Sequence, residues 1–375
     1  MSHADDPAAL ARLFAVFARD HRGDPLYARL ATLFAEHPPR FAPLAAAAPV
    51  QRKPVLLFAA IHDRLLALRE AGQALPALAA YYPSLGGRRA PDEALAPALD
   101  AFLADEDGLL RQTVAQQATQ TNEVGRSAVL WPALAEIAQR HGGRPLALFD
   151  FGCSAGLNLS VDAFRVQYRD ADGRDAFAVG ATTDPAATAL ACRLLGAAPP
   201  TTAWRLTHRL GADLAPVSLD DPRAVRWLRA CLWPSETERA ARFEQALRQA
   251  RAARHPVRAA GDGLALLADW LRGLPAGTTP VLFNSWVLFY FSPADLAAHT
   301  ARVHALVREH GLVWLSAEDR SSLHATTGLV APAAPAGADG TPTWWSLSAR
   351  GPDGGVQHRL LACSHPHGEW LDWHR

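Results

Sequence analysis

The sequence contains few of the residues that build covalent or strongly charged sites. Its 4 cysteines are far apart and none forms a C-x-x-C pair, so neither a disulfide framework nor a cysteine-based zinc site is suggested. Lysine occurs only as Lys53, and the total of 37 Lys+Arg equals the total of 37 Asp+Glu. Because neither sign of charge is in excess, binding to nucleic acid is not expected.

Long hydrophobic runs are also missing. Charged residues interrupt every apolar run well before the roughly 20 residues that span a bilayer. The acidic start of the chain lacks the basic-then-apolar pattern of a signal peptide. At 375 residues with 49% hydrophobic and 20% charged residues, the chain suits one or two globular domains. We therefore expect a soluble cytoplasmic protein without a membrane partner.

Residues 1–141 predict an all-helical cap domain. Apolar residues recur there at spacings of three and four, the helical period, in five segments: residues 8–20, 25–36, 54–71, 92–104 and 122–141. Turn residues separate these segments, and nothing in the first four forms a nucleophile–base or metal-ligand pattern.

Residues 142–375 predict a Rossmann-like α/β domain. Short apolar runs alternate with helical stretches such as 157–168, which indicates a mostly parallel sheet; the runs lie at residues 145–151, 257–260, 280–283 and 311–316. Residues 344–349 and 356–363 predict a final antiparallel hairpin around a glycine-rich turn. We expect seven strands in total, with the last hairpin strand antiparallel.

The turn after the first predicted strand carries the strongest signal. Residues 149–158 read Phe-Asp-Phe-Gly-Cys-Ser-Ala-Gly-Leu-Asn, which places Asp150, Gly152, Ser154 and Gly156 between a strand and a helix. Gly152 permits a sharp backbone turn, and Gly156 permits a ligand to approach the backbone closely. The helix N-terminus offers free N–H groups. The carboxylate of Asp150 disfavours a pyrophosphate and favours an ammonium or hydroxyl group, which points to S-adenosylmethionine rather than NAD.

This turn resembles the first motif of class I S-adenosylmethionine-dependent methyltransferases, an acidic residue followed by Gly-x-Gly-x-Gly, with Ser154 in place of the middle glycine. From about Asn122 to the C-terminus the chain is also similar to an uncharacterised bacterial family, domain of unknown function 2332. That second resemblance rests on five segments: Asn-Glu-Val-Gly-Arg at 122–126, Ser-Ala-Gly-Leu-Asn at 154–158, Gly-Ala-Asp-Leu-Ala-Pro at 211–216, Trp-Leu-Arg-Ala-Cys-Leu-Trp-Pro at 227–234 and His-Pro-His-Gly at 365–368. Together the resemblances imply a methyltransferase-like fold with S-adenosylmethionine as cofactor, and no established reaction.

Two further carboxylates match the methyltransferase fold by resemblance. Asp213 follows the predicted second strand, where that fold holds the ribose hydroxyls, and a carboxylate can accept two hydrogen bonds from a vicinal diol. Asp262 lies in a Gly-Asp-Gly turn after the third strand, where that fold contacts the adenine amino group. Each has an ordinary alternative as a helix cap or a turn residue. Because 63 residues separate Asp150 from Asp213, we expect an inserted segment at 169–205 that forms a lid.

Other polar positions are candidates for contact with a small-molecule substrate. Asn284 and Tyr290 follow the run at 280–283, at the sheet edge where ligands of open α/β sheets bind, although Tyr290 suits the core equally well. Asn122, Glu123 and Arg126 begin the last helix before the sheet. In one interpretation Asn122 caps this helix and Glu123 stabilises its first turn. In the other, all three side chains line a cleft between the helical cap and the sheet, where Arg126 would hold the cofactor carboxylate through a bidentate pair.

A serine hydrolase is the main alternative, because Gly-Cys-Ser-Ala-Gly also fits the nucleophile elbow G-x-S-x-G. Ser154 would be the nucleophile, Glu318 or Asp319 the acid, and His365 or His367 the base. Only helices are expected before this strand, however, whereas the elbow serine usually follows several strands. The carboxylate two residues before the turn would also oppose a developing oxyanion. A non-catalytic protein that binds S-adenosylmethionine is the third possibility.

The sequence predicts no metal site and identifies no catalytic residue. His365, His367 and Glu369 have side chains that bind zinc or iron. The intervening proline constrains their geometry, and no third, distant ligand is evident. We expect this segment to be a strand-end turn or part of the substrate-side packing. The methyl acceptor and the oligomeric state are not defined by the sequence.

Overall fold

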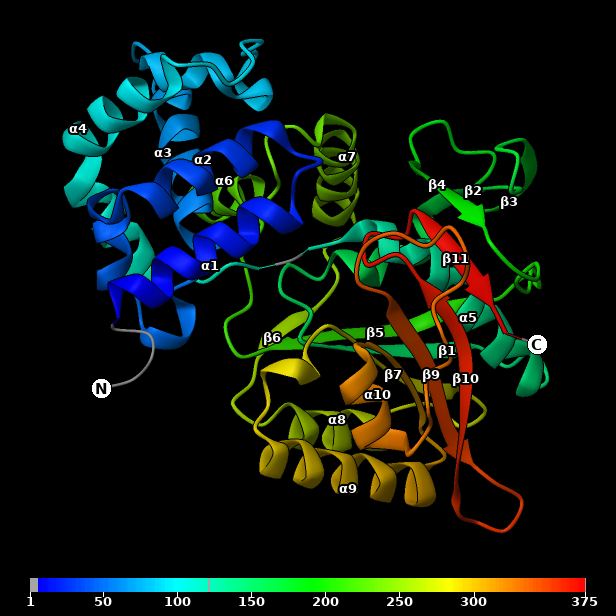
Figure 1. Cartoon of the computed structure of the whole chain (residues 1–375). Coiled ribbons are helices and arrows are strands. Elements are labelled where there is room, and N and C mark those ends of the chain that lie inside the picture. Colours follow the sequence, from blue (N-terminus) through cyan, green and yellow to red (C-terminus); the bar gives the residue numbers. More distant parts are fainter. Residues whose placement is uncertain (1–5, 121, 375) are drawn as a thin grey trace. The chain divides into compact units, whose positions relative to one another are not determined.

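The computed structural model describes residues 6–120 and 122–374, and the chain divides into two compact units (Figure 1). The first unit contains Met1–Thr121 and Ser218–Ala241, and the second contains Asn122–Val217 and Arg242–Arg375. This division differs from the predicted boundary at residue 141. The segment 122–141 belongs to the second unit, and the segment 218–241 returns to the first.

The described part of the first unit is built from helices, several of which begin with proline after an aspartate cap. Its helices are α1 (Pro7–Asp20), α2 (Pro25–Glu36), α3 (Pro54–Glu70), α4 (Leu95–Gln116) and α6 (Pro222–Ala230), with the 3-10 turns η2 (Pro38–Ala46), η3 (Pro49–Gln51), η4 (Ala77–Tyr81) and η5 (Pro83–Leu85). The first three helices lie where the apolar periodicity predicts them. The fourth, predicted at 92–104, begins later and continues to Gln116.

The segment 218–241 joins the first unit because its apolar side chains complete that unit's core. Trp227 on α6 is buried there, and its indole N–H donates to the carbonyl of Ala118 at 2.9 Å. His62 on α3 is bonded through Nδ1 to the carbonyl of Ala230 at 3.1 Å. Burial lowers the pKa of His62 to about 4, so this imidazole is a neutral structural group in the core.

The second unit is a large mixed sheet with helices. Its strands are β1 (Leu146–Phe151), β2 (Phe164–Arg169), β3 (Asp175–Gly180), β4 (Thr188–Leu194), β5 (Leu206–Asp213), β6 (Val257–Ala259), β7 (Thr279–Ser285), β8 (Val313–Glu318), β9 (Thr343–Arg350), β10 (Val356–Ser364) and β11 (Trp370–Trp373). Its helices are α5 (Ser127–Arg140), α8 (Gly263–Arg272), α9 (Pro293–His310) and α10 (Arg320–Thr327), with η6 (Val124–Arg126), η7 (Leu157–Ala163) and η8 (Leu288–Tyr290). Helix α7 (Thr237–Ala253) crosses the boundary between the units.

The strand order is β3-β2-β4-β11-β10-β9-β8-β7-β1-β5-β6. Strand β1 lies between β5 and β6 on one side and β7 and β8 on the other, and all five strands are parallel. After β2–β4, which lie at the far end of the sheet, the chain adds β5 and β6 on one side of β1 and then crosses to β7 and β8 on the other. Strand β1 is therefore the point where the winding direction reverses. In open α/β sheets ligands bind beyond the carboxyl ends of the strands at such a point.

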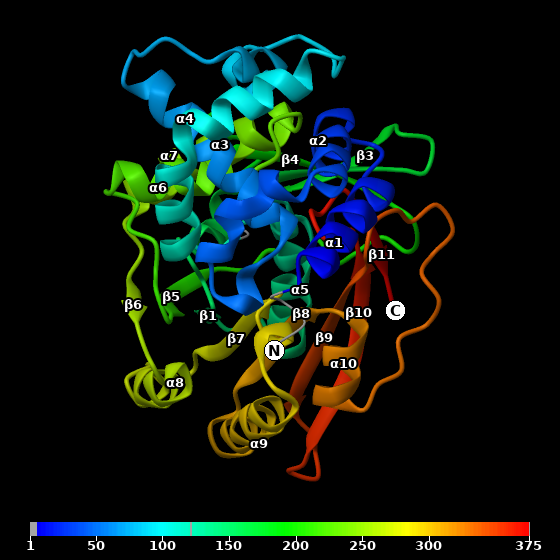
Figure 2. The same ribbon diagram turned by 60° about the vertical axis from the view of Figure 1, so that its left-hand side comes forward.

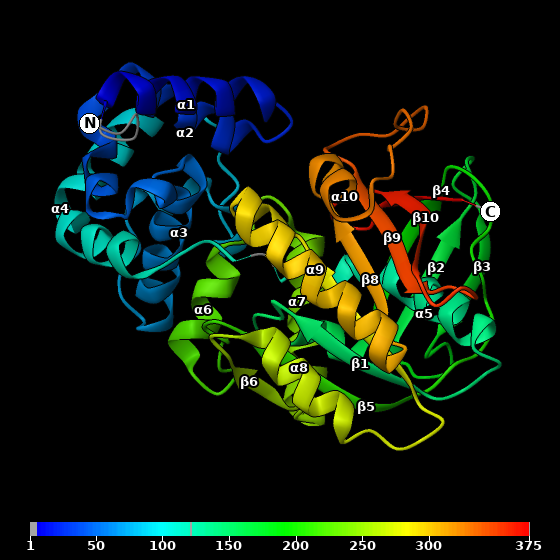
Figure 3. The ribbon, with the colours of Figure 1, turned by 90° about the horizontal axis from the view of Figure 1, so that it is seen from below.

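Two helices cover one face of these parallel strands. Helices α8 and α9 lie next to each other across the sheet (Figure 3). Their apolar residues, such as Leu267 and Val303, form one buried cluster with Phe149, Leu282 and Trp314 of the strands. Helix α5 is buried along most of its length, so the sequence immediately before β1 is part of this unit.

The end of the chain forms the predicted hairpin. Strands β9 and β10 pair antiparallel around the turn at residues 351–355, and Figure 2 shows them as a long ribbon next to β8. Because β9 is antiparallel to both neighbours, β10 ends at the same sheet edge as β8. The register confirms this, since Trp344 pairs with both Glu318 of β8 and Cys363 of β10.

Several sequence predictions for this unit are wrong in detail. Among the described residues the sheet has eleven strands, not seven. Residues 157–168, predicted as a helix, form η7 followed by β2, whose burial alternates with a period of two. The segment 169–205, predicted as a lid, contributes β3 and β4, which hydrogen-bond into the sheet beside β2 and β11. The strands β1, β7, β8 and β9 were easier to predict because most of their residues are buried.

No helix in residues 6–120 or 122–374 combines the length and the apolar composition needed to cross a membrane. The four cysteines are free thiols.

Candidate functional site

The turn after β1 is held in a conformation that L-residues rarely adopt. Gly152 and Gly156 have φ of 74° and 70°, as expected for glycine. Ser154 between them also has a positive φ, of 50°. A serine therefore occupies a backbone position that favours glycine, which agrees with its place in the resembled Gly-x-Gly-x-Gly motif.

Side chains from two other segments clamp this turn. The Asn122 amide donates to Ser154 Oγ at 2.9 Å, and its Oδ1 accepts from the backbone N–H of Ala155 at 3.1 Å. From the other direction, Asp213 Oδ2 accepts from the backbone N–H of Ser154 at 2.9 Å. Its Oδ1 accepts from the backbone N–H of Ala215 at 2.9 Å. Predicted site residues from three distant segments, Asn122, Ser154 and Asp213, thus meet at the end of β1.

The two glycines make room for side chains of the same unit. A Cβ on Gly152 would lie 2.4 Å from Cγ2 of Val287, and a Cβ on Gly156 would lie 2.8 Å from Cγ2 of Val257. In the structure the absence of a side chain at Gly156 makes room for Val257, and the close approach of a ligand there stays a prediction. Glycine suits both positions for two reasons: the backbone has a positive φ there, and a Cβ would collide with Val287 or Val257.

Asp150 is the most unusual group at this edge. Its side chain is 2% exposed, and its Oδ2 is buried without a hydrogen-bond partner. Burial, with a smaller contribution from the charge of Asp213, raises the pKa of Asp150 to about 7. A buried carboxyl oxygen without a donor costs free energy, so this position suits a ligand that supplies a cation or a hydroxyl group.

A second buried carboxyl lies at the ends of β7 and β8. Glu318 is 1% exposed, and its Oε1 accepts from the Asn284 amide at 2.8 Å and from the backbone N–H groups of Val287 and Leu288. Its Oε2 is buried without a hydrogen-bond partner. Burial raises the pKa of Glu318 to about 7, and the three hydrogen bonds oppose that shift.

Asn284 is consequently a structural residue. Its Oδ1 accepts from the indole N–H of Trp314 at 2.6 Å, and its amide also donates to Ser316 Oγ. In the sequence Glu318 is a candidate only as the acid of a hydrolase triad. Glu318 is the last residue of the fully buried strand β8. A carboxylate at the end of such an apolar run was the signal that could have identified its hydrogen bonds with Asn284, Val287 and Leu288.

Arg126 connects two parts of the same edge. It is 5% exposed, its Nε donates to the carbonyl of Pro366 at 2.9 Å, and its Nη1 donates to Ser285 Oγ at 3.1 Å. Glu123, also buried, accepts from the backbone N–H of Gly125 through Oε1 at 2.8 Å. The sequence assigned the cap to Asn122 and the first turn to Glu123, whereas in the structure Glu123 is the N-cap of η6. Arg126 ties the β10–β11 turn to the end of β7.

Two predicted site residues have other roles. Asp262 caps α8 by accepting from the backbone N–H groups of Leu264 and Ala265. It also forms an exposed ion pair with Arg302 at 2.9 Å, which lowers the pKa of its carboxyl. Tyr290 is 61% exposed and its ring packs at a tilt against that of Phe289, so it lies on the surface rather than in the core.

Glu318 and Asp319, the two candidate acids of a hydrolase triad, form no hydrogen bond with a histidine among the described residues. Asp319 caps α10 through hydrogen bonds to Ser321 and Ser322. The free oxygen of Glu318 has no hydrogen-bond partner, so neither acid orients a histidine as a triad requires. In the described residues before β1, moreover, only helices occur.

An open cavity of about 520 Å³ lies beside this edge. It is lined mainly by apolar side chains from the β7–α9 connection and the first turn of α9, among them Trp286, Leu288, Phe289 and Phe291, with Asp319 and Ser322 from the start of α10. Its size is within the range of small-molecule sites.

The sheet and the clamped turn define a mixed α/β protein whose candidate site is at the carboxyl edge of its central strand. The chain belongs to the bacterial family described as "Uncharacterized protein conserved in bacteria (DUF2332)", which matches residues 11–373. That match confirms the family resemblance seen in the sequence and assigns no reaction.

Other comparisons give little more. No curated protein matches the chain. Among solved structures, the chain is similar to DesVI of Streptomyces venezuelae with a TM-score of 0.24 and 14% sequence identity. The similarity covers 63% of this chain and 75% of DesVI. At that TM-score the likeness does not indicate a function.

Proposed function

We propose that this protein binds S-adenosylmethionine at the turn after β1 and transfers its methyl group to a small-molecule acceptor. The observation that carries the proposal is the buried Oδ2 of Asp150, which has no hydrogen-bond donor. Asp150 lies on β1, the strand at which the winding order of the sheet reverses. A ligand with an ammonium or hydroxyl group would supply that donor.

The residues present fit this cofactor. Asp213 is half-buried, and each of its oxygens accepts one backbone N–H. A second lone-pair site remains on each oxygen, which suits the vicinal hydroxyls of a ribose. When bound, the cofactor would supply an electrophilic methyl group on a sulfonium.

The chain's own residues would position the reactants. Methyl transfer is an in-line displacement, so precise orientation contributes most of what the protein must provide. Asn122 and Asp213 fix the turn from opposite directions, and Arg126 fixes the neighbouring turn at the end of β10. The protein needs a general base only if the acceptor must lose a proton early.

A small-molecule acceptor is supported by the open cavity next to β7 and β8. Its walls are largely apolar, with a few polar groups at one end, the usual composition of a small-molecule site. The balance of acidic and basic residues agrees with a small molecule rather than a nucleic acid.

The test is isothermal titration calorimetry with S-adenosylmethionine and S-adenosylhomocysteine on the wild type and on Asp150→Asn. Losing a charged hydrogen-bond partner costs about 1.5–3 kcal/mol, so the variant should bind roughly 10- to 100-fold more weakly. Asp353→Asn is the matched control, because Asp353 lies in the β9–β10 turn at the opposite edge of the sheet. It should bind like the wild type. Absence of binding by the wild type, or equal affinity in both variants, contradicts the proposal.

Ser154 separates this proposal from a hydrolase. Ser154→Gly should relieve strain at the positive φ and preserve most cofactor binding, whereas in a hydrolase it would remove the nucleophile. Assays with generic esters should detect no activity in either protein. Robust wild-type esterase activity that disappears in Ser154→Gly would favour the hydrolase.

A further inference from the structure

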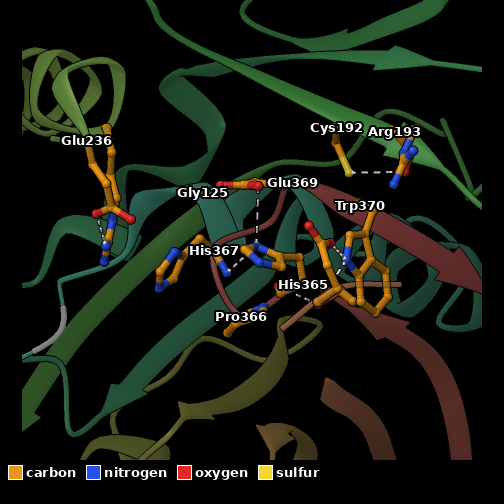
Figure 4. Close-up of polar contacts among 12 residues, drawn as sticks. Gly125, Cys192, Arg193, Glu236, His365, Pro366, His367, Glu369 and Trp370 are labelled. Atoms are coloured by element: carbon orange, nitrogen blue, oxygen red, sulfur yellow. Dashed lines mark hydrogen bonds and ion pairs between the residues drawn. The ribbon is translucent and has the colours of Figure 1, made fainter. Parts of the chain in front are cut away.

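The turn between β10 and β11 gathers three side chains that the proposed function does not use. His365, His367 and Glu369 each offer a nitrogen or oxygen atom, and these three atoms all lie within 4.8 Å of one another. Figure 4 shows the three residues on the same tight turn. Histidine nitrogens and a carboxylate oxygen form a donor set that binds divalent transition metals.

The backbone of the turn brings these side chains together. The N–H of Gly368 donates to the carbonyl of His365, and the N–H of His365 donates to the carbonyl of Trp370. Gly368 has a φ of 73°, which allows the chain to reverse. As a result the side chain of Glu369 lies next to that of His365, and Oε2 of Glu369 is 3.9 Å from Nδ1 of His365.

The hydrogen bonds of His365 indicate which nitrogen is the ligand. Nδ1 accepts a long hydrogen bond from the backbone N–H of His367 at 3.2 Å, so in the neutral ring it carries the lone pair and Nε2 carries the proton. Nε2 lies against Gly340, where a Cβ would be only 3.1 Å away. Nδ1 therefore faces Glu369, and a metal ion would replace a weak hydrogen bond rather than a strong one.

The turn is also held firmly from outside. Arg126 donates to the carbonyl of Pro366, and Trp370, next to Glu369, donates its indole N–H to Asp339 Oδ1 at 2.8 Å. Gly125 packs directly on the turn, because a Cβ there would lie 2.0 Å from the carbonyl oxygen of His367. Rigid support of this kind fixes ligand geometry in metal sites. Pro366, which argued against a site in the sequence, is part of that support.

We propose that His365, His367 and Glu369 bind one divalent transition-metal ion such as Zn²⁺. Bonds of about 2.0–2.2 Å place two ligands of one ion roughly 3.3–4.4 Å apart, and the 3.9 Å between His365 Nδ1 and Glu369 Oε2 falls in that range. Glu369 is exposed, so it can rotate to close the remaining distance. Three protein ligands leave the other coordination positions to water or to an oxygen or nitrogen of a bound small molecule.

The site lies on the same sheet edge as Asp150. Arg126 contacts both Pro366 in this turn and Ser285 at the end of β7, and β7 is the direct neighbour of β1. The metal inference does not depend on methyl transfer, because it rests only on the donor atoms and the turn that holds them.

The experiment uses the full chain without a histidine tag, stripped with a chelator and titrated with Co²⁺ and Zn²⁺. We expect one equivalent of Co²⁺ to produce visible d–d bands without a thiolate charge-transfer band, and Zn²⁺ to displace it. Loss of an outer-shell partner typically weakens metal binding 10- to 100-fold. His367→Ala and Glu369→Gln, which remove ligands, should weaken it at least about tenfold.

The matched controls are His310→Ala and Glu309→Gln, which remove the same side-chain types from exposed positions at the end of α9. They should bind Co²⁺ like the wild type. Glu369→Gln alters an exposed side chain, so it keeps the test valid if His367→Ala fails to fold. No stoichiometric binding by the wild type, a thiolate band, or equal affinity in Glu369→Gln and the controls would each overturn the proposal.

Discussion

At the scale of single residues, Asp150 has the clearest physical consequence. Its pKa is about 7 in the folded protein against an ordinary value of 3.8. Well below pH 3.8 the carboxyl is protonated in both the folded and the unfolded state. As the pH rises, the unfolded chain loses this proton first, so the free energy of unfolding falls until about pH 7. A difference of roughly three pKa units corresponds to at most about 4 kcal/mol.

Asp150→Asn removes this titration. The gap in stability between the variant and the wild type should be smallest below pH 4, widen in favour of the variant up to about pH 7 and then level off. Urea denaturation of both proteins at several pH values measures the difference. A gap between the two proteins that stays constant from pH 4 to pH 8 would show that Asp150 titrates normally.

At the scale of elements, the contact between η6 and the β10–β11 turn is the tightest backbone approach at the site. A Cβ on Gly125 would lie 2.0 Å from the carbonyl oxygen of His367, and one on Gly368 would lie 1.9 Å from the carbonyl oxygen of Gly125. Overpacking of this kind typically costs 1–3 kcal/mol and occasionally more. We expect Gly125→Ala to lose about 3 kcal/mol in denaturant unfolding.

Gly261→Ala is the matched control, because a Cβ there meets nothing within 4 Å and the residue lies in the same unit. Its free energy of unfolding should stay the same or rise by about 0.4–1 kcal/mol, since alanine restricts the unfolded chain. Equal losses in the two variants would mean that the close approach of η6 to the turn is not needed for stability.

The burial pattern of each strand explains whether the sequence could predict it. Strands such as β1 and β8 are buried throughout, so a short apolar run marks them. Strand β2 reads Phe-Arg-Val-Gln-Tyr-Arg with alternate burial, and its charged residues made it look like the end of a helix. In the site, Asp150 and Asp213 lie at the ends of β1 and β5, the strand-end positions that the sequence indicates. The hydrogen bonds of Arg126 to Pro366 and Ser285 were not predictable, because these residues are more than a hundred positions away.

At the scale of the whole molecule, the two units are not consecutive in the chain. Helix α5 is almost entirely buried, and Trp131 on it accepts a hydrogen bond from Trp204 through its carbonyl oxygen at 3.1 Å. A fragment of residues 142–375, cut at the boundary that the sequence suggests, lacks this helix and Asn122. We expect it to show no cooperative thermal transition, and a fragment of residues 122–375 to regain one.

Circular dichroism melts of the two fragments and the full chain provide the measurement. If the shorter fragment melts as cooperatively as the longer one, α5 is dispensable and the boundary at residue 141 is the correct one. The sequence could not reveal the return of residues 218–241 to the first unit, because such a return leaves no local pattern.

The interrupted first unit also sets an order of events during synthesis. Helix α6, with Trp227, lies about 100 residues after the end of α4, and ribosomes add roughly 5–20 residues per second. For about 5–20 s the nascent α1–α4 segment therefore has part of its apolar surface exposed. This interval is much longer than the hydrophobic collapse of a chain of this length, which takes well under a millisecond. Chaperones that bind exposed apolar segments have their main opportunity on this chain in that interval, before residue 230 leaves the ribosome.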